Sequence, residues 1–377
     1  MYISTYEELS AFCERAARFN AIAVDTEFLR ERTYHPRLCL VQVATPDECV
    51  VIDVIAIDNL APLAILMRDE GTVKVFHACS QDMEVLNYTL GALPAPIFDT
   101  QIAAAFLGER MQTSYNGMVH AFCGVTLPKS ESLTDWSRRP LTPEQIEYAL
   151  DDVRYLIKAY DVIMERLDES GRASWVLDEI RPLTDRSHYV VDRRVAFKRV
   201  KRVNSLTRRQ LAVARELAAW REARAEYSNI PRKWLMSDEV LIALSKRPPH
   251  DAASLRRVRG TEQLSDADVA GALSVIARGE SCPADKYPFI ARTHKPASPE
   301  LESVIDLMYA LIRLVGERSG VATAMIASRD DLVDYVDHPQ DSPLREGWRF
   351  ELVGTLIDDL LNGDIGLTVK DRALEIL

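Results

Sequence analysis

The stretch that most constrains the fold of this chain is residues 21–29, Ala-Ile-Ala-Val-Asp-Thr-Glu-Phe-Leu. Its apolar start, with β-branched residues at alternate positions, predicts a buried strand that ends in polar residues. Because side chains alternate along a strand, Asp25 and Glu27 lie on one face. Adjacent carboxylates must be solvated, protonated or neutralised, and Mg²⁺ or Mn²⁺ suits oxygen ligands. Taken alone, the pattern also fits a polar strand end that runs into a loop.

Length and composition predict a soluble protein of several domains. A chain of 377 residues is too long for one typical core, and we expect two or three domains. No apolar run approaches the roughly 20 residues that span a membrane, and no signal-peptide pattern opens the chain. The six cysteines form no Cys-x-x-Cys pair, so a zinc site is not expected and the cysteines are predicted to be reduced core residues. We therefore expect a cytoplasmic protein.

Charge is distributed unevenly along the chain. Residues 1–192 carry 17 Lys and Arg against 30 Asp and Glu, a net charge of −13. Residues 193–260 carry 18 against 6, a net charge of +12. A basic block in an otherwise acidic chain indicates an anionic partner held at one place. A solvated helical surface with internal salt bridges would explain the same charges equally well.

The first half of the chain has the pattern of an α/β domain. Beyond the first strand we expect three more strands, at residues 38–44, 49–54 and 73–77. A helix is expected at residues 59–69, before the last of these strands. The turn at 45–48 is of the kind that joins antiparallel neighbours. Ser80 can cap the next helix, which places Asp82 in the first turn, where an acid also favours the helix dipole without any role in a site. Asp99 is predicted to cap a further helix.

The third carboxylate-bearing segment is a long helix. Thr142-Pro143-Glu144-Gln145 is a strong helix start, with a Thr cap and Pro at the first helical position. We expect this helix to continue to about Leu167. Tyr148 and Asp152 are four residues apart and therefore share a face, although a surface Tyr–Asp pair would show the same spacing.

The second half of the chain is helical in pattern. A basic linker is expected first, then two helical domains separated by a proline-containing linker, which look like loosely similar repeats. The expected boundaries are 1–192 for the α/β domain, 193–204 for the basic linker, 205–284 for the first helical domain, 285–298 for the second linker and 299–377 for the last domain.

Together, Asp25, Glu27, Asp82, Tyr148 and Asp152 resemble the site residues of the DEDD exonucleases of the tyrosine subtype. Three motifs carry this resemblance in the expected order, and the third has the Tyr-x-x-x-Asp spacing of the subtype. They are Val24-Asp25-Thr26-Glu27-Phe28, His77-Ala78-Cys79-Ser80-Gln81-Asp82 and Glu147-Tyr148-Ala149-Leu150-Asp151-Asp152.

The resemblance narrows to the ribonuclease D family at residues 26–43, 99–108 and 127–141. Trp220-Arg221 and Asn229-Ile230-Pro231 are similar to an HRDC domain, and the block from about 299 resembles a second, more divergent one without the Asn-x-Pro segment. The resemblance implies an α/β RNase H-like exonuclease domain followed by two all-α HRDC-type domains. It also implies a hydrolase that releases nucleoside 5′-monophosphates from the 3′ ends of structured RNA, such as tRNA precursors.

The chemistry implied by this family needs two divalent cations, Mg²⁺ or Mn²⁺, which activate water, neutralise phosphate and stabilise the leaving oxygen. Asp25 is the candidate to bridge both ions. Glu27 and Asp152 would complete the ion that activates water, and Asp82 would hold the other. Tyr148 would orient the attacking water, because an unperturbed tyrosine is a poor base at neutral pH.

Four residues are candidates to contact RNA: Phe28, Arg199, Lys201 and Arg202. No obligate protein partner and no membrane association are evident from the sequence. Two other functions stay open at this point. One is a DNA-directed 3′→5′ exonuclease, because no residue can be assigned to reading a 2′-hydroxyl. The other is a catalytically idle RNA-binding scaffold.

Overall fold

The computed structural model describes residues 1–128, 134–290 and 299–377. Part of the motif at 127–141 and most of the expected linker at 285–298 therefore lie outside the described residues. The chain forms two compact units. The first contains residues 1–27, 39–185 and the C-terminal region, and the second contains residues 28–38 and 186–293.

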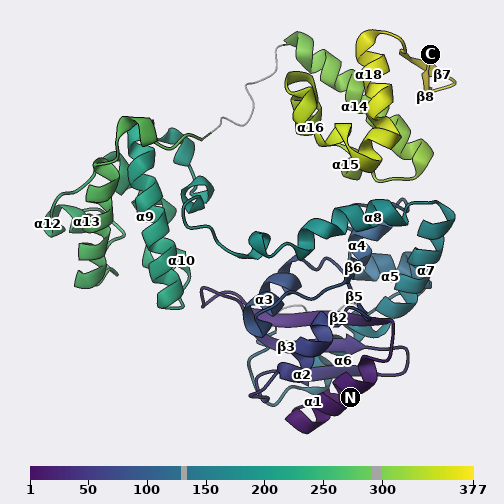
Figure 1. Ribbon diagram of the computed structural model, residues 1–377, viewed down its shortest axis with the longest axis horizontal. Helices are drawn as coiled ribbons and strands as arrows, with labels where there is room; N and C mark the ends of the chain where they lie inside the picture. The colour runs from purple at the N-terminus through teal and green to yellow at the C-terminus, as the bar shows by residue number, and fades with distance from the viewer. Residues whose placement is uncertain (129–133, 291–298) are drawn as a thin grey trace. The chain divides into compact units, whose positions relative to one another are not determined.

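A six-stranded mixed sheet forms the centre of the first unit, in the order β1-β4-β3-β2-β5-β6. Figure 1 labels β2, β3, β5 and β6 of this sheet. β3 and β4 are antiparallel, with Leu40 opposite Asp53, which confirms the predicted turn between them. β2 and β5 are parallel, with Ala21 opposite Val73. The strands are β1 (Tyr2–Ile3), β2 (Ala21–Leu29), β3 (Arg37–Ala44), β4 (Cys49–Asp53), β5 (Val73–Phe76) and β6 (Ile97–Asp99).

The apolar start of β2 forms part of the core, as its sequence predicts. Ile22, Ala23 and Val24 are fully buried, and burial of an isoleucine or valine side chain contributes roughly 1.5–3 kcal/mol. The residues that follow are only partly buried except Thr26, so the strand changes character at Asp25. A rigid, buried strand thus delivers the first two carboxylates.

Eight α-helices lie in the described residues of the exonuclease portion of this unit. They are α1 (Tyr6–Ala16), α2 (Ala61–Arg68), α3 (Ser80–Leu90), α4 (Thr100–Ala105), α5 (Tyr115–Cys123), α6 (Pro143–Arg154), α7 (Leu156–Glu169) and α8 (Ala173–Ile180). The prediction that Ser80 caps α3 is wrong, because Cys79 occupies the cap position and provides no side-chain hydrogen bond. The capping box at Thr142 and the cap at Asp99 are both confirmed.

The single helix expected from residue 143 to about 167 is interrupted at Tyr155. Tyr155 ends α6 with φ −102° and ψ −4°, and α7 begins at the next residue. The two helices bury different faces against different partners, since α6 packs on β4 and α7 packs on α5. The break allows each helix to follow its own partner, which the sequence pattern does not reveal.

The second unit has an all-helical core. Its long helix α9 packs against α13, and Gly279 permits the close approach, because a Cβ there would lie 2.6 Å from the Cα of Val213. A capping box at Thr207 begins α9. The helices are α9 (Arg208–Tyr227), α10 (Arg232–Leu235), α11 (Asp238–Lys246), α12 (Ala252–Arg256) and α13 (Asp266–Glu280).

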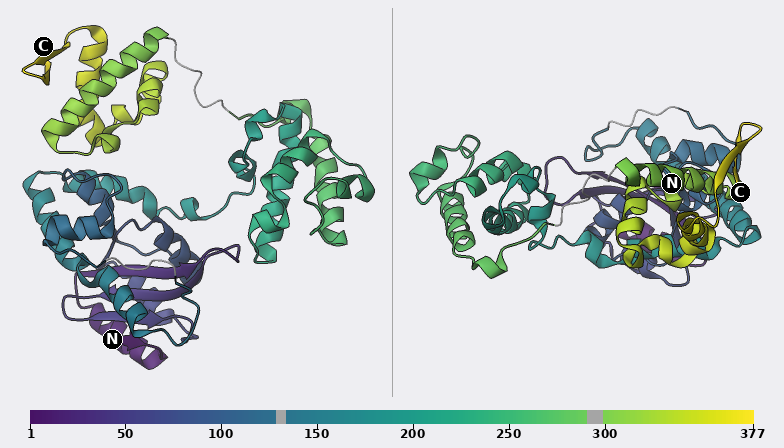
Figure 2. Two further views of the ribbon diagram at one scale, coloured as in Figure 1. Left: turned by 180° about the vertical axis from the view of Figure 1, so that it is seen from behind. Right: turned by 90° about the horizontal axis from the view of Figure 1, so that it is seen from above.

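The C-terminal region is helical but ends in a β-hairpin, visible in Figure 2, so the all-α prediction is wrong for the last residues. Asp371 and Arg372 have φ of 50° and 66°, and a two-residue hairpin turn of type I′ needs positive φ at both positions. The elements are α14 (Pro299–Ser319), α15 (Thr323–Ile326), α16 (Arg329–Asp337), α17 (Gly347–Arg349), the π-helix η8 (Phe350–Gly354), α18 (Thr355–Asn362), β7 (Leu367–Lys370) and β8 (Ala373–Ile376).

The C-terminal region packs on the exonuclease helices of the same unit. The Trp348 ring stacks on Trp175, with ring centroids 5.6 Å apart. Arg349 Nη1 lies 2.6 Å from Glu179 Oε1, and the backbone N–H of Ala322 donates to the α4 carbonyl of Ala105 at 2.8 Å. Within the described residues, no helix has the length and apolar character needed to cross a membrane.

Candidate metal centre

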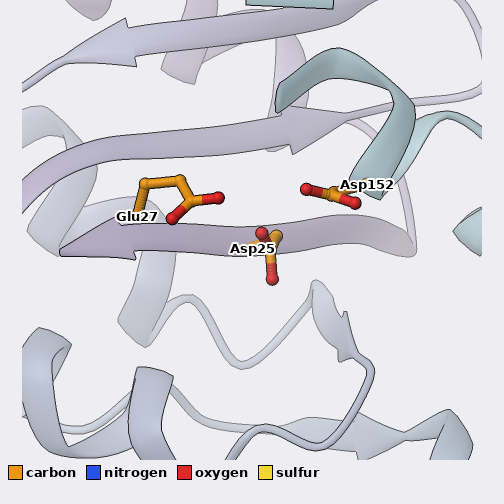
Figure 3. A group of neighbouring side chains, drawn as sticks. All are labelled: Asp25, Glu27 and Asp152. Carbon is orange, nitrogen blue, oxygen red and sulfur yellow. The ribbon is translucent and has the colours of Figure 1, made fainter. Parts of the chain in front are cut away.

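Three carboxylates converge where β2 meets α6. Asp25 and Glu27 lie on β2, and Asp152 lies near the end of α6. Each offers one oxygen, and these oxygens all lie within 4.8 Å of one another (Figure 3). All three side chains are partly buried. The geometry therefore brings together three of the four carboxylates that the sequence indicates.

The fourth carboxylate, Asp82, lies in the first turn of α3 and is 7% exposed. The hydroxyl of Thr26, on β2 between the two acidic residues, donates a hydrogen bond to Asp82. The charge of Asp82 also helps to raise the pKa of Asp25. Asp82 is thus tied to β2 and acts electrostatically on the cluster, although its oxygens are not part of the three-residue group.

The electrostatics of the site favour a bound cation. Burial and then repulsion from Asp82, Asp152 and Glu27 raise the pKa of Asp25 well above its usual range. Burial and the charges of Asp152 and Asp82 raise the pKa of Glu27 to about 8. Burial also raises the pKa of Asp82 and of Asp152 to about 7. Carboxylates crowded in this way are costly to ionise unless a cation compensates their negative charge. A divalent cation that takes oxygen ligands would supply that compensation.

Tyr148 lies one helical turn before Asp152 and hydrogen-bonds its carboxylate, which partly offsets the effect of burial on the pKa of Asp152. The indole ring of Trp136, which is 6% exposed, stacks on the Tyr148 ring with centroids 5.9 Å apart and planes at 27°. The neighbouring Asp151 is not part of the site, because it pairs with Arg154. Trp136 was not among the residues predicted for the site; it lies within the motif at 127–141, but its packing partner lies on the helix that follows the motif.

The turn that leads into α3 is fixed by a residue expected only to cap a helix. Asp99 accepts hydrogen bonds from the backbone N–H groups of Ala78 at 3.1 Å and Cys79 at 2.8 Å, in addition to capping α4. Ala78 adopts a φ of 63°, which is rare for a residue with a side chain. Asp99 therefore holds a strained turn just before the helix that carries Asp82.

The candidate RNA-contacting residues belong to the second unit. Phe28 follows Glu27 on β2, and the Arg30 guanidinium lies 5.5 Å from the centre of its ring. Arg199 ends a short 3₁₀ helix, and Lys201 and Arg202 follow it with exposed side chains. Lys201 also donates its backbone N–H to Asp238 at 2.9 Å. These three cations are accessible to an anionic partner.

Comparison with known proteins decides the family. A model of 3′–5′ exonucleases matches residues 1–168, and a model of the HRDC domain matches residues 210–264. A ribonuclease D from Jannaschia sp. is 39% identical over 384 residues, covering 100% of this chain and 98% of that protein. The chain belongs to the ribonuclease D family of 3′–5′ exoribonucleases.

Other members of the ribonuclease D family extend this likeness to structure. The ribonuclease D of Granulibacter bethesdensis is 36% identical over 379 residues, covering 100% of this chain and 96% of that protein. The crystal structure of Escherichia coli RNase D, described as an exoribonuclease involved in structured RNA processing, matches with a TM-score of 0.82. It is 32% identical, and the match covers 96% of this chain and 98% of that one. The predicted exonuclease domain and one HRDC domain are therefore confirmed.

Proposed function

We propose that this ribonuclease D family member is a divalent-metal-dependent enzyme that trims the 3′ ends of structured RNA, such as tRNA precursors, in the cytoplasm. The observation that carries the proposal is the cluster of Asp25, Glu27 and Asp152, whose oxygens lie within 4.8 Å of one another. The described involvement of the E. coli protein in structured RNA processing supports the substrate class.

The acidic residues would act as the ligands of two Mg²⁺ or Mn²⁺ ions. Asp25 lies on β2 beside both Glu27 and Asp152, which suits a bridging role. Asp82, in the first turn of α3, would add the fourth carboxylate. When bound, such ions activate a water molecule, neutralise the scissile phosphate and stabilise the leaving oxygen. The phosphate of the substrate would approach a site that without cations repels it.

Tyr148 would orient the attacking water. Its hydroxyl already contacts Asp152, and the stacked Trp136 ring restricts its side chain. A hydroxyl held beside a ligand carboxylate can donate or accept one hydrogen bond at a defined position. Positioning is the role that fits this geometry, because a neutral tyrosine hydroxyl is a weak base.

The remaining parts of the chain would gather the RNA. Arg199, Lys201 and Arg202 expose their side chains from the basic segment, and Phe28 lies next to Glu27 on β2. We assign residues 1–192 to the exonuclease domain, 193–204 to a basic linker, 205–284 to the first HRDC domain, 285–298 to a second linker and 299–377 to a second, divergent HRDC-like domain.

A cleavage assay tests the proposal. Matched RNA and DNA oligonucleotides with free or blocked 3′ ends are incubated with the protein and EDTA, Mg²⁺ or Mn²⁺. We expect stepwise release of nucleoside 5′-monophosphates from RNA with a free 3′ end, only when a divalent ion is present. Faster degradation of DNA than of RNA would assign a DNA-directed exonuclease. RNA binding without cleavage under every ion condition would assign an idle scaffold.

A further inference from the structure

A groove of about 750 Å³ lies within the second unit. Its walls come from helices α9 and α13 and from two flanking segments, one before α9 and one after α13. Arg215 and Glu216 contribute from α9, Arg278 from α13, Arg194 from the segment before α9, and Phe289 from the segment after α13. Every lining residue belongs to this unit, so the groove is complete within it.

The groove has an excess of positive charge. Glu216 is the carboxylate of the lining, and it receives Arg215 Nε at 3.1 Å and Arg278 Nε at 2.7 Å. The lining therefore holds three guanidinium groups and one carboxylate. The Arg278 side chain is 63% exposed and Arg194 is also exposed, so both can reach a bound anion. Guanidinium groups recognise phosphate through paired N–H donors.

An aromatic ring stands beside these cations. Phe289 is 68% exposed, although the chain around it is anchored. The next residue, Ile290, packs against the helical core. Arg208 donates to the carbonyl of Tyr287 at 3.2 Å, and Arg215 donates to the carbonyl of Lys286 at 3.5 Å. The backbone thus presents the Phe289 ring at a fixed place, within the stretch that the sequence indicates as a linker.

We propose that this groove binds one unpaired nucleotide of the RNA, with its base on Phe289 and its phosphates at Arg194 and Arg278. The inference rests on the proposed function, because it takes RNA as the ligand. Single-stranded nucleic acids are bound by this combination, a basic groove that follows the backbone and an aromatic face on which a base stacks. One exposed ring among several guanidinium groups offers a protein partner little apolar area, whereas the groove matches the charge of a nucleotide and has room for one.

Binding of a short single-stranded RNA to the full chain, measured by fluorescence anisotropy in EDTA, tests the groove. Phe289→Ala should weaken binding roughly tenfold, because that is the order of one base–aromatic stack, and Phe289→Trp should restore it. Arg194→Ala with Arg278→Ala should weaken binding and reduce the log–log salt slope by about 1.4, or about 0.7 for each lost phosphate contact.

The matched control is Arg257→Ala with Arg259→Ala, which removes the same charge from exposed positions of the same unit outside the groove lining. Unchanged melting temperatures show that each variant is folded. The proposal is overturned if the groove variants bind RNA as the control does while the wild-type protein still degrades RNA with Mg²⁺. The converse, groove-dependent RNA binding without any cleavage, would overturn the proposed function and leave the groove assignment standing.

Discussion

The exonuclease portion contains two groups of acidic side chains that differ in how their charge is balanced. Asp53, at the end of β4, has a side chain that is only 2% exposed. Arg139 contacts it through Nε at 2.5 Å and Nη2 at 2.6 Å, and the Tyr2 hydroxyl donates to it. Burial alone would raise the pKa of Asp53, but these hydrogen bonds lower it below its usual value.

The carboxylates of the candidate metal centre show the opposite behaviour. For Asp25 and Glu27 the charged neighbours that shift the pKa are other carboxylates, and the shifts are upward. Among the residues that the structure describes, the same sheet therefore supports one acid whose counter-ion is an arginine of the chain and a group of acids whose charged neighbours are other acids. A structural acid is satisfied by its own protein, whereas a cation-binding site leaves its negative charge for a ligand to neutralise.

The largest effect is expected from removing the central carboxylate. Asp25→Asn should reduce exonuclease turnover at least a hundredfold, the size of losing one group that stabilises the transition state. The same change should raise the melting temperature of the metal-free protein, because it relieves repulsion with Glu27 and Asp152. Activity is measured with saturating Mg²⁺, and melting is measured in EDTA. Turnover near that of the wild type would exclude Asp25 from the site.

A change at the structural acid, Asp53, should instead destabilise the fold. Arg139→Ala leaves Asp53 buried without its cation and should lower the free energy of unfolding by about 2–3 kcal/mol, below the range for fully buried pairs because Arg139 is 23% exposed. The adjacent Arg138→Ala is the matched control, since its side chain is 84% exposed and its pairing with Asp135 should contribute at most about 0.5 kcal/mol. Urea denaturation measures both. Equal losses would remove the distinction between the two groups.

A smaller effect is expected from Tyr148→Phe, which removes the hydroxyl but keeps the ring stacked on Trp136. Turnover should fall about tenfold, below the usual range for positioned proton-transfer groups, because bound ions would supply most of the activation. Mg²⁺ dependence and RNA affinity should stay close to those of the wild type. A single-turnover rate equal to that of the wild type would assign Tyr148 a structural role only.

The smallest effect concerns pH. The pKa of Glu27 is raised to about 8, and those of Asp82 and Asp152 to about 7, so the folded protein holds protons that the unfolded chain releases near pH 4–5. Their stabilising contribution is present below pH 4 and is lost as pH rises through the folded pKa values. In EDTA, the melting temperature should therefore decline by a few degrees between pH 5 and 8. If the melting temperatures of the wild type and of Asp25→Asn are both independent of pH over this range, the upward pKa shifts are contradicted.

The sequence predicts the parts of this site that depend on local pattern. The bounds of β2, the antiparallel turn between β3 and β4 and the cap at Asp99 all follow from alternation, turn chemistry and capping preference. What it does not predict depends on distant partners. The stack of Trp136 on Tyr148, the second set of hydrogen bonds at Asp99 and the break at Tyr155 arise only when separate elements pack together.

The most direct test of the central claim is calorimetric titration of the nuclease with Mn²⁺ at pH 7 in buffers of different ionisation enthalpy. The three carboxylates should bind the ion, and because several of them hold protons at this pH, binding should release protons, with less release at pH 9. Asp25→Asn should bind far more weakly, while Arg139→Ala, wherever it remains folded, should bind as the wild type does. Mn²⁺ binding that is unaffected by Asp25→Asn, or that releases no protons at pH 7, would contradict the account.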